Sequence, residues 1–210
     1  MRISEIFHSL QGEGVLIGTP TVFVRTCGCN LECVWCDTKY AREEQGTEMS
    51  PSEVVEKVKG YEIPYVCLTG GEPMLQKDMF ELVELLLKNS LHVTMETNGS
   101  MSLEELPCSD GLLISMDIKC PSSGMSERMM MENLELLSPA DQLKFIIADE
   151  EDILFAEKVL KEHEVLCPVI MTPVGGIDLR QLAERVLKKR LNVRVLPQLQ
   201  KIIWGERRGV

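Results

Sequence analysis

Four cysteines lie within ten residues of one another near the start of the chain: Cys27, Cys29, Cys33 and Cys36. A four-cysteine zinc site normally uses two separated cysteine pairs, and no second pair follows. Disulfides suit secreted proteins, and nothing in the sequence indicates secretion. The C-x₃-C-x₂-C spacing that begins at Cys29 instead suits a [4Fe–4S] cluster whose fourth iron has no protein ligand. That iron could chelate the amino and carboxylate groups of a cofactor.

The remaining cysteine of this group, Cys27, stands two residues before the first expected ligand. We interpret it as a spare thiol near the end of a strand, although an exchange of roles with Cys29 is also open. The other four cysteines of the eight are scattered along the chain, as is usual for small buried apolar residues.

A second chemical feature is the turn Gly70-Gly71-Glu72-Pro73, which follows the apolar run Tyr65–Thr69. Glycines permit positive φ angles and a close approach of the backbone to a ligand. An isolated glycine pair would indicate only a tight turn. Its position one strand after the cysteines favours a cradle for a cofactor.

Polar residues also close the next strands. Glu96, Thr97 and Asn98 could face a ribose or the substrate. Ser115, Asp117 and Lys119 alternate along one strand and would point to the same side. Inward polar side chains are costly in a dry core and expected at the mouth of a ligand site, although an ordinary buried ion pair is the alternative.

The elements that must position these residues alternate between strands and helices. The predicted strands are 21–26, 65–69, 92–97, 112–118, 143–148, 168–172 and 193–197, and the predicted helices include segments 50–60, 77–89, 126–137, 152–163 and 179–190. Mostly apolar strands separated by helices indicate a parallel sheet covered on both faces. We therefore predict an α/β fold, a partial or modified (β/α) TIM-like barrel of mainly parallel strands. The loops after the strand ends would form the site.

Composition narrows the class of protein. Of the 210 residues, 44% are hydrophobic, and the formal net charge is −11. A nucleic-acid-binding protein would carry a basic stripe, so we expect a small-molecule substrate and no direct nucleic-acid partner. No segment is predicted to cross a membrane or to act as a signal peptide, which favours a cytoplasmic protein. The length of the chain favours a single domain over residues 1–210.

Motifs along nearly the whole chain resemble one family. They are Phe7 to Gly14, Gly18-Thr19-Pro20, Phe23-Val24-Arg25, Cys36-Asp37-Thr38, Thr69 to Leu75, Glu96 to Gly99, Leu196 to Leu199 and Trp204-Gly205. Together with the cysteine spacing, they resemble the 7-carboxy-7-deazaguanine synthase family of the radical S-adenosylmethionine (SAM) superfamily.

The resemblance implies a reaction. In this family a reduced [4Fe–4S] cluster cleaves SAM to a 5′-deoxyadenosyl radical, which removes a hydrogen atom from 6-carboxy-5,6,7,8-tetrahydropterin. The pterin rearranges with ring contraction and loss of ammonia to 7-carboxy-7-deazaguanine, a precursor of 7-deazapurines of the queuosine and archaeosine type. Magnesium assists, and the radical forms on the cofactor, so no catalytic side chain is assigned.

The resemblance also implies roles for individual residues. Iron ligands would be Cys29, Cys33 and Cys36, and the magnesium ligand Thr38. Substrate contacts would come from Leu10, Gln11, Gly12, Arg25 and Thr69, and SAM contacts from Trp35, Cys36, Asp37, Gly71, Ser115, Asp117, Lys119 and Thr172. An arginine offers a planar, bidentate fork for a carboxylate, which suits Arg25 to the acidic substrate.

The match has departures and rivals. This chain has Gln200 where many members have histidine before the lysine, and the segment after Ser115 is longer than in some relatives. A glycyl-radical activase and a non-catalytic zinc or iron–sulfur module are the alternatives. The family further implies a homodimer and an electron donor such as flavodoxin or ferredoxin.

Overall fold

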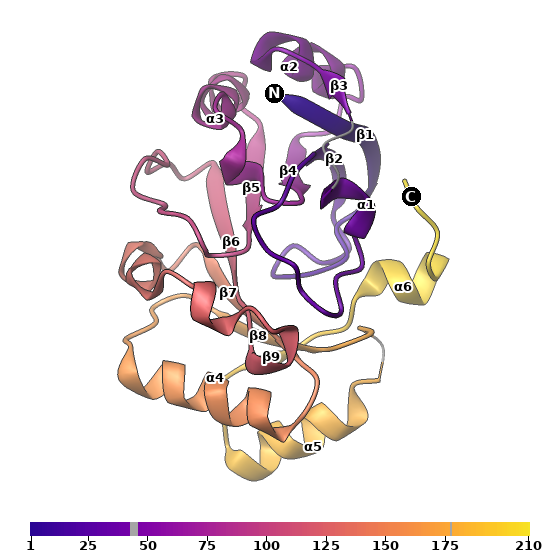
Figure 1. The fold of residues 1–210 in the computed structure, drawn as a ribbon. Coiled ribbons are helices and arrows are strands. Elements are labelled where there is room, and N and C mark those ends of the chain that lie inside the picture. The colour runs from indigo at the N-terminus through magenta and orange to yellow at the C-terminus, as the bar shows by residue number, and fades with distance from the viewer. Residues whose placement is uncertain (43–45, 177) are drawn as a thin grey trace.

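The computed structural model describes residues 1–42, 46–176 and 178–210. In these residues the strands form one sheet in the order β3-β1-β2-β4-β5-β6-β7-β8-β9. The strands are β1 (Arg2–Leu10), β2 (Pro20–Thr26), β3 (Thr47–Glu48), β4 (Tyr65–Gly70), β5 (His92–Thr97), β6 (Leu112–Ile118), β7 (Gln142–Ile147), β8 (Val169–Pro173) and β9 (Arg194–Val195). Figure 1 shows that the strands follow an arc, so the sheet curves around one side of the molecule.

All seven predicted strands are present, and each lies parallel to its neighbours from β2 to β9. The arc does not close, because β3 and β9 end the sheet. The predicted partial barrel of mainly parallel strands is therefore confirmed. The sequence reading missed β1 and β3, which pair antiparallel at one edge. The strand β1 is mostly half-buried and mixes polar with apolar residues, so it lacks the apolar run that marks the inner strands.

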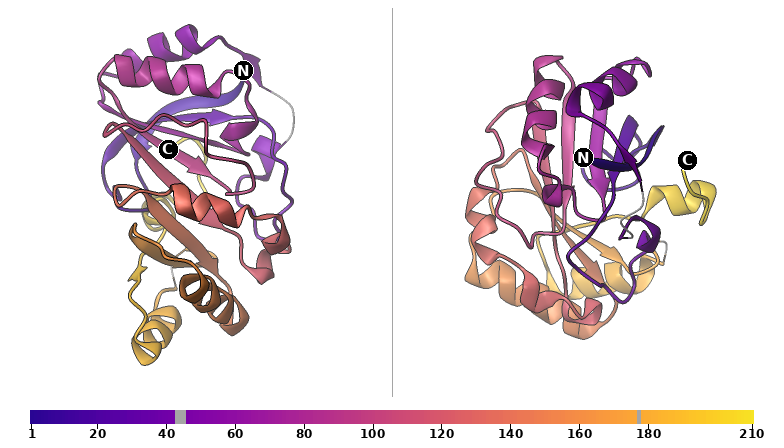
Figure 2. Two further views of the ribbon diagram at one scale, coloured as in Figure 1. Left: turned by 90° about the vertical axis from the view of Figure 1, so that its left-hand side faces the viewer. Right: turned by 45° about the horizontal axis from the view of Figure 1, so that its top comes forward.

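Helices cover the outer face of the arc. They are α2 (Pro51–Lys59), α3 (Met79–Lys88), α4 (Glu150–Glu162) and α5 (Arg180–Lys189), whereas the short α1 (Lys39–Arg42) and α6 (Leu199–Trp204) lie on the inner side, as the two further views also show (Figure 2). A capping box begins α2. Ser50 accepts a hydrogen bond from the Glu53 backbone, and the Glu53 carboxylate accepts one from the Ser50 backbone.

The prediction of a helix over residues 126–137 is wrong. The segment forms two 3₁₀ turns, Ser126–Arg128 and Met131–Leu136. The reason is Asn133, whose amide donates to the Gly99 and Met101 carbonyls and whose side-chain oxygen accepts from Leu103. These tertiary bonds hold the turn against the neighbouring loop and override the helical spacing.

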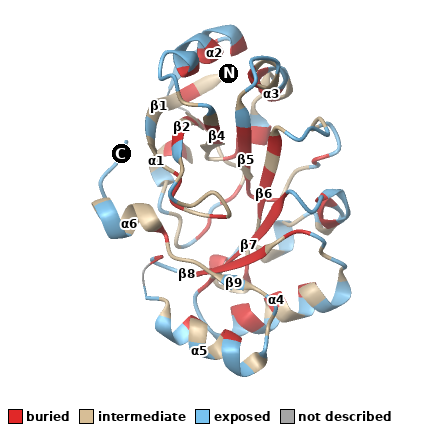
Figure 3. Cartoon of the chain, turned by 180° about the vertical axis from the view of Figure 1, so that it is seen from behind, coloured by how far each residue is buried: buried red, intermediate tan, exposed pale blue. Residues whose placement is uncertain are grey.

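The core lies between the sheet and the outer helices. Buried side chains from both layers, such as Val58, Leu82, Leu68 and Met95, belong to one continuous cluster. Figure 3 shows this as buried strands from β4 to β8 with exposed outer faces on α4 and α5. Burying one such aliphatic side chain contributes about 1.5–3 kcal/mol to folding, so the helices fix the strand ends firmly. No helix in the described part of the chain is long and apolar enough to cross a bilayer.

Candidate active site

A cavity of about 350 Å³ opens on the inner side of the arc, beside the carboxyl ends of the strands. It brings together most of the residues predicted from the sequence. Those on its wall are Leu10, Gln11, Gly12, Arg25, Cys29, Cys33, Trp35, Cys36, Asp37, Thr38, Thr69, Gly71, Asp117 and Lys119. Strand register explains the convergence, because β2 and β4 pair Arg25 with Thr69, and β5 and β6 pair Glu96 with Ser115.

Two predicted SAM contacts do not reach this wall. Ser115 is fully buried behind it, where its hydroxyl donates to Glu96 and accepts from Gln142. Thr172 is also buried within β8, and the next residue, Pro173, lines the cavity in its place. The structure therefore gives Ser115 the geometry of a support for Glu96.

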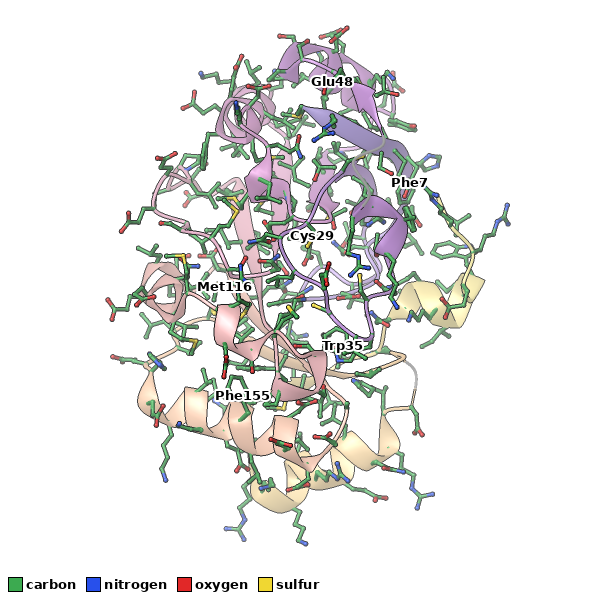
Figure 4. All side chains as sticks on the ribbon, in the orientation of Figure 1. Phe7, Cys29, Trp35, Glu48, Met116 and Phe155 are labelled. Atoms are coloured by element: carbon green, nitrogen blue, oxygen red, sulfur yellow. The ribbon has the colours of Figure 1, made fainter. Side chains whose placement is uncertain are left out.

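The cysteine loop connects β2 with α1. Cys29, Cys33 and Cys36 all face the cavity, and Figure 4 shows Cys29 near the centre of the molecule. Cys27 is buried elsewhere, with its sulfur against Gly46, where an added Cβ would lie 2.5 Å away. Among the described residues, no three side chains of His, Cys, Asp or Glu enclose a single metal ion.

Glycines bring the cradle against this loop. Gly71 donates to the Thr26 carbonyl, and the next backbone NH, of Glu72, donates to the Gly28 carbonyl at 2.8 Å. A Cβ on Gly71 would lie 2.0 Å from the Gly28 oxygen, so only glycine fits. The two segments predicted to hold the cofactor are thereby joined through their backbones.

The Glu72 side chain also holds the turn at Gly70 and Gly71 in place. Its carboxylate is fully buried and accepts hydrogen bonds from the Met74 and Asn98 backbones and from the Thr97 hydroxyl. Burial raises the pKa of Glu72 to about 7, although these donors favour the charged form. The side chain thus ties the end of β4 to the end of β5 and does not reach the cavity wall.

One buried charge next to the cavity, the ammonium of Lys144, was not predicted from the sequence. Lys144, from β7, is 2.7 Å from Glu96, 3.1 Å from Glu13 and 3.5 Å from Asp117. Burial alone would lower the pKa of Lys144, but these three carboxylates raise it well above its ordinary value. Burial opposes ionisation of Glu13, yet Lys144 and the Gln198 amide hold the pKa of that carboxyl below its ordinary value.

Asp117 and Lys119 complete this network. Their charged atoms are 2.6 Å apart, and the Lys119 ammonium also lies 5.7 Å from the centroid of the Trp35 ring. Burial opposes the charge on Asp117, but Lys119 and Lys144 lower its pKa. The carboxylate is therefore ionised next to the cysteine loop.

Arg25 also lies on the cavity wall. Its Nε donates to Glu5 at 2.8 Å, and its guanidinium is 5.9 Å from the ring centroids of Phe7 and Tyr40. Arg208, from the segment after α6, stacks on Tyr40 at 3.6 Å and also pairs with Glu5. Glu5 and Arg208 were not predicted, because Glu5 contacts Arg25 only through the pairing of β1 with β2, and Arg208 contacts Glu5 only once the C-terminal segment has folded against β1.

The loop after β1 meets the C-terminal segment. The Gly12 carbonyl accepts from the Leu199 backbone at 2.9 Å, and a Cβ on Gly12 would overlap the Gln200 amide. The Gln200 side-chain oxygen is buried and has no hydrogen-bond donor among the described residues. A buried acceptor of this kind on the cavity wall is suited to a donor group of a ligand.

Comparisons with known proteins agree with this geometry. A model of the radical SAM superfamily matches residues 23–117. A 7-carboxy-7-deazaguanine synthase of Thermoplasma acidophilum is 41% identical over 210 residues and covers 100% of both chains. The synthase of Methanospirillum hungatei is 43% identical, covering 97% of this chain and 85% of its own. The crystal structure of QueE from Escherichia coli has a TM-score of 0.76 and 25% identity, and 92% of each chain is covered.

The open parallel arc and the three-cysteine loop facing a glycine cradle define a radical SAM enzyme. Within that superfamily, the chain belongs to the 7-carboxy-7-deazaguanine synthase family. It is an enzyme of 7-deazapurine biosynthesis whose cofactors are a [4Fe–4S] cluster, SAM and Mg²⁺. The described residues fit these groups, because three thiols and a close glycine backbone meet in one cavity.

Proposed function

We propose that this chain converts 6-carboxy-5,6,7,8-tetrahydropterin to 7-carboxy-7-deazaguanine with loss of ammonia. The observation that carries the proposal is a single cavity lined by the three cysteines, by Arg25 and by the loop of Gln11 and Gly12. When bound, the cluster and SAM supply a radical able to remove a hydrogen atom. The protein's own residues bind both reactants, orient them and keep water from the site.

The predicted site residues fall into three groups, according to whether they would bind iron, SAM or the pterin. Cys29, Cys33 and Cys36 would hold the irons. Trp35, Asp37, Gly71, Asp117 and Lys119 lie next to this loop and would contact SAM, with Ser115 and Thr172 acting from behind the wall. Leu10, Gln11, Gly12, Arg25 and Thr69 line the same cavity and would hold the pterin.

The decisive experiment is anaerobic incubation of the reconstituted enzyme with reductant, SAM and the carboxytetrahydropterin, followed by mass analysis. Formation of 7-carboxy-7-deazaguanine and ammonia is expected. A brown protein with about four irons per chain would exclude the zinc module. Release of 5′-deoxyadenosine without any pterin product, even with excess substrate, would favour the glycyl-radical activase.

Thr38 provides a prediction about the metal. Its hydroxyl donates to Asp37 at 2.8 Å, which leaves its oxygen lone pairs available to a hard cation. We expect Thr38→Ala to raise the Mg²⁺ concentration needed for half-maximal turnover by at least about tenfold. Such a loss of metal affinity is typical even of residues outside the first coordination shell. Turnover is measured against Mg²⁺ concentration, with Thr47→Ala as the matched control. An unchanged Mg²⁺ curve with Thr38→Ala would remove the residue from the metal site.

Arg25 provides a prediction about the substrate. Loss of a charge-assisted contact in a buried site costs roughly 2–5 kcal/mol, which corresponds to about thirtyfold to several-thousandfold weaker productive binding. Glu5 keeps Tyr40 and Arg208 as partners, so we expect the Arg25→Ala variant to fold. It should still assemble its cluster and release 5′-deoxyadenosine slowly without coupling to product.

The measurement for Arg25 is the ratio of 5′-deoxyadenosine to 7-carboxy-7-deazaguanine under strong reductant. Arg25→Lys should rescue poorly, because a point charge cannot reproduce the planar fork. The exposed Arg180→Ala variant is the control and should match the parent. A parental ratio and pterin affinity in Arg25→Ala would exclude Arg25 from the substrate site.

We further propose a single radical SAM domain over residues 1–210 that acts in the cytoplasm as a homodimer. The continuous sheet and single core support one domain. Light scattering tests the dimer, and turnover with flavodoxin or ferredoxin as reductant tests the electron donor. The acidic net charge of −11 supports a small-molecule partner over nucleic acid.

A further inference from the structure

A chain of hydrogen bonds connects the cysteine loop to a helix outside the cavity. The indole Nε1 of Trp35 donates to the Ser122 hydroxyl at 3.2 Å, and that hydroxyl lies 2.6 Å from Oδ2 of Asp152. Asp152 is fully buried in the first turn of α4, and neither it nor Ser122 lines the cavity. Trp35 does line it, between the second and third expected iron ligands (Figure 4).

The direction of each bond follows from the groups involved. An indole N–H can only donate, and a carboxylate can only accept. The Ser122 hydroxyl must therefore donate its proton to Asp152 and accept the Trp35 proton with its lone pair. If the Ser122 hydroxyl hydrogen pointed at Trp35, two donors would face each other, and Asp152 would face a lone pair. The rotation of the hydroxyl is therefore fixed.

Asp152 is itself held in place by backbone donors. Its Oδ1 accepts from the Ser122 backbone at 3.0 Å, and its Oδ2 also accepts from the Ala148 backbone at 2.8 Å. Both oxygens therefore face an N–H group. An asparagine at this position would direct its NH₂ at one of those donors, so a carboxylate is specifically required.

Two further contacts fix Trp35. The Lys119 ammonium lies 5.7 Å from the centroid of the ring, and the adjacent Val34 backbone donates to the Ser123 carbonyl at 3.1 Å. The ring is thus held at its polar edge by Ser122, at its face by a cation and through its backbone by the neighbouring turn. Neither of the other two contacts sets the rotation of the indole as the N–H bond does.

We propose that Asp152 and Ser122 are positioning residues that set the plane of the Trp35 indole for contact with SAM. The inference rests on the proposed role of Trp35 at the cofactor. Contacts of an aromatic ring depend on the angle at which it meets the ligand, so losing its orientation lowers affinity without removing the ring. The relay makes α4 part of the cofactor site.

The test measures SAM affinity of the reconstituted enzyme by anaerobic equilibrium dialysis. Ser122→Ala should weaken binding between about twofold and twelvefold, the effect of one net hydrogen bond, with parental iron content. Ser122→Thr keeps the hydroxyl and should restore affinity. Ser126→Ala, in the next turn, is the matched control and should bind as the parent does.

A double-mutant cycle separates positioning from general structure. In a Trp35→Phe background the N–H group is gone, so Ser122→Ala should cause no further loss. If the two losses simply add, Ser122 acts independently of Trp35 and the relay is wrong.

A second readout needs neither cluster nor SAM. In a Trp204→Phe background Trp35 is the single tryptophan, since the sequence contains two. Its fluorescence anisotropy in the iron-free protein should fall with Ser122→Ala and with Asp152→Ala, and stay parental with Ser126→Ala. Unchanged anisotropy in both relay variants would overturn the inference. Failure of the parent to bind iron or SAM would instead contradict the proposed function, and the anisotropy would still decide the relay.

Discussion

Cys29→Ala, Cys33→Ala and Cys36→Ala should each abolish the iron–sulfur absorbance and the activity, whereas Cys27→Ala should keep most of both. Each of the three ligands would bind a different iron, so the cluster loses one corner when any of them is removed. Cys27 is buried beside Gly46, off the cavity wall, and its position predicts no iron contact. Iron per chain and visible absorbance after anaerobic reconstitution measure the effect.

The control for this series is Cys108→Ala, which changes an exposed cysteine that does not line the cavity. It should reconstitute as the parent does. Complete loss of iron in Cys27→Ala, together with normal iron in Cys29→Ala, would show that these two cysteines have exchanged roles. Normal iron in any two of the three ligand variants would contradict the cluster assignment.

The sequence predicts the parts of this site that depend on local chemistry. The cysteine spacing and the Gly70-Gly71 turn are short-range patterns, and parallel strands bring their carboxyl ends to one edge. The structure places both on one wall and adds the reason for glycine, the Gly28 carbonyl 2.0 Å from an added Cβ. The strands themselves were predictable because buried parallel strands are continuous apolar runs.

The parts that could not be predicted depend on contacts between distant segments. Lys144 stands in an apolar run, and its ion pair with Glu13 joins residues 131 apart in sequence. Strand order and register, which pair Asp117 with Lys144, are needed before that lysine has a role. A lysine within an apolar strand is the available signal, because an unpaired charge would not be tolerated there.

The failed helix over 126–137 has the same cause. Its spacing is helical, but Asn133 bonds to the 99–103 loop, and nothing in the local pattern indicates that partner. The polar face of Asp117 and Lys119 was read correctly as inward, yet both alternatives offered for it hold. The pair is a buried ion pair and also lines the cavity.

Lys144→Met should lower the free energy of unfolding by about 3–5 kcal/mol, one of the largest single-site effects in the chain. The lysine side chain is 6% exposed and forms ion pairs with Glu13, Glu96 and Asp117. Methionine fills the space but removes the cation that all three carboxylates share, and Asp117 keeps its ion pair with Lys119. For a chain of this size the loss corresponds to a fall in Tm of about 6–20 °C.

The deficit of the Lys144→Met variant should depend on pH. Without the ammonium, the lowered pKa of Glu13 should rise, and the pKa of Glu96, which burial already raises above 4.5 in the parent, should rise further. A folded state that binds more protons than the unfolded state loses stability as pH rises. The variant should therefore lie closest to the parent near pH 5 and furthest from it near pH 8, as measured by urea unfolding of the iron-free proteins.

Two variants make this prediction specific. Lys188→Met removes an exposed lysine from α5 and should change stability by less than about 0.5 kcal/mol. Adding Glu96→Gln to Lys144→Met removes one uncompensated charge and should restore part of the loss at pH 8 but little at pH 5. A deficit that is equal at both pH values, and unaffected by Glu96→Gln, would mean that Lys144 stabilises the site through packing. A deficit confined to high pH identifies it as the cation that holds the substrate loop at Glu13 to the strand ends at Glu96 and Asp117.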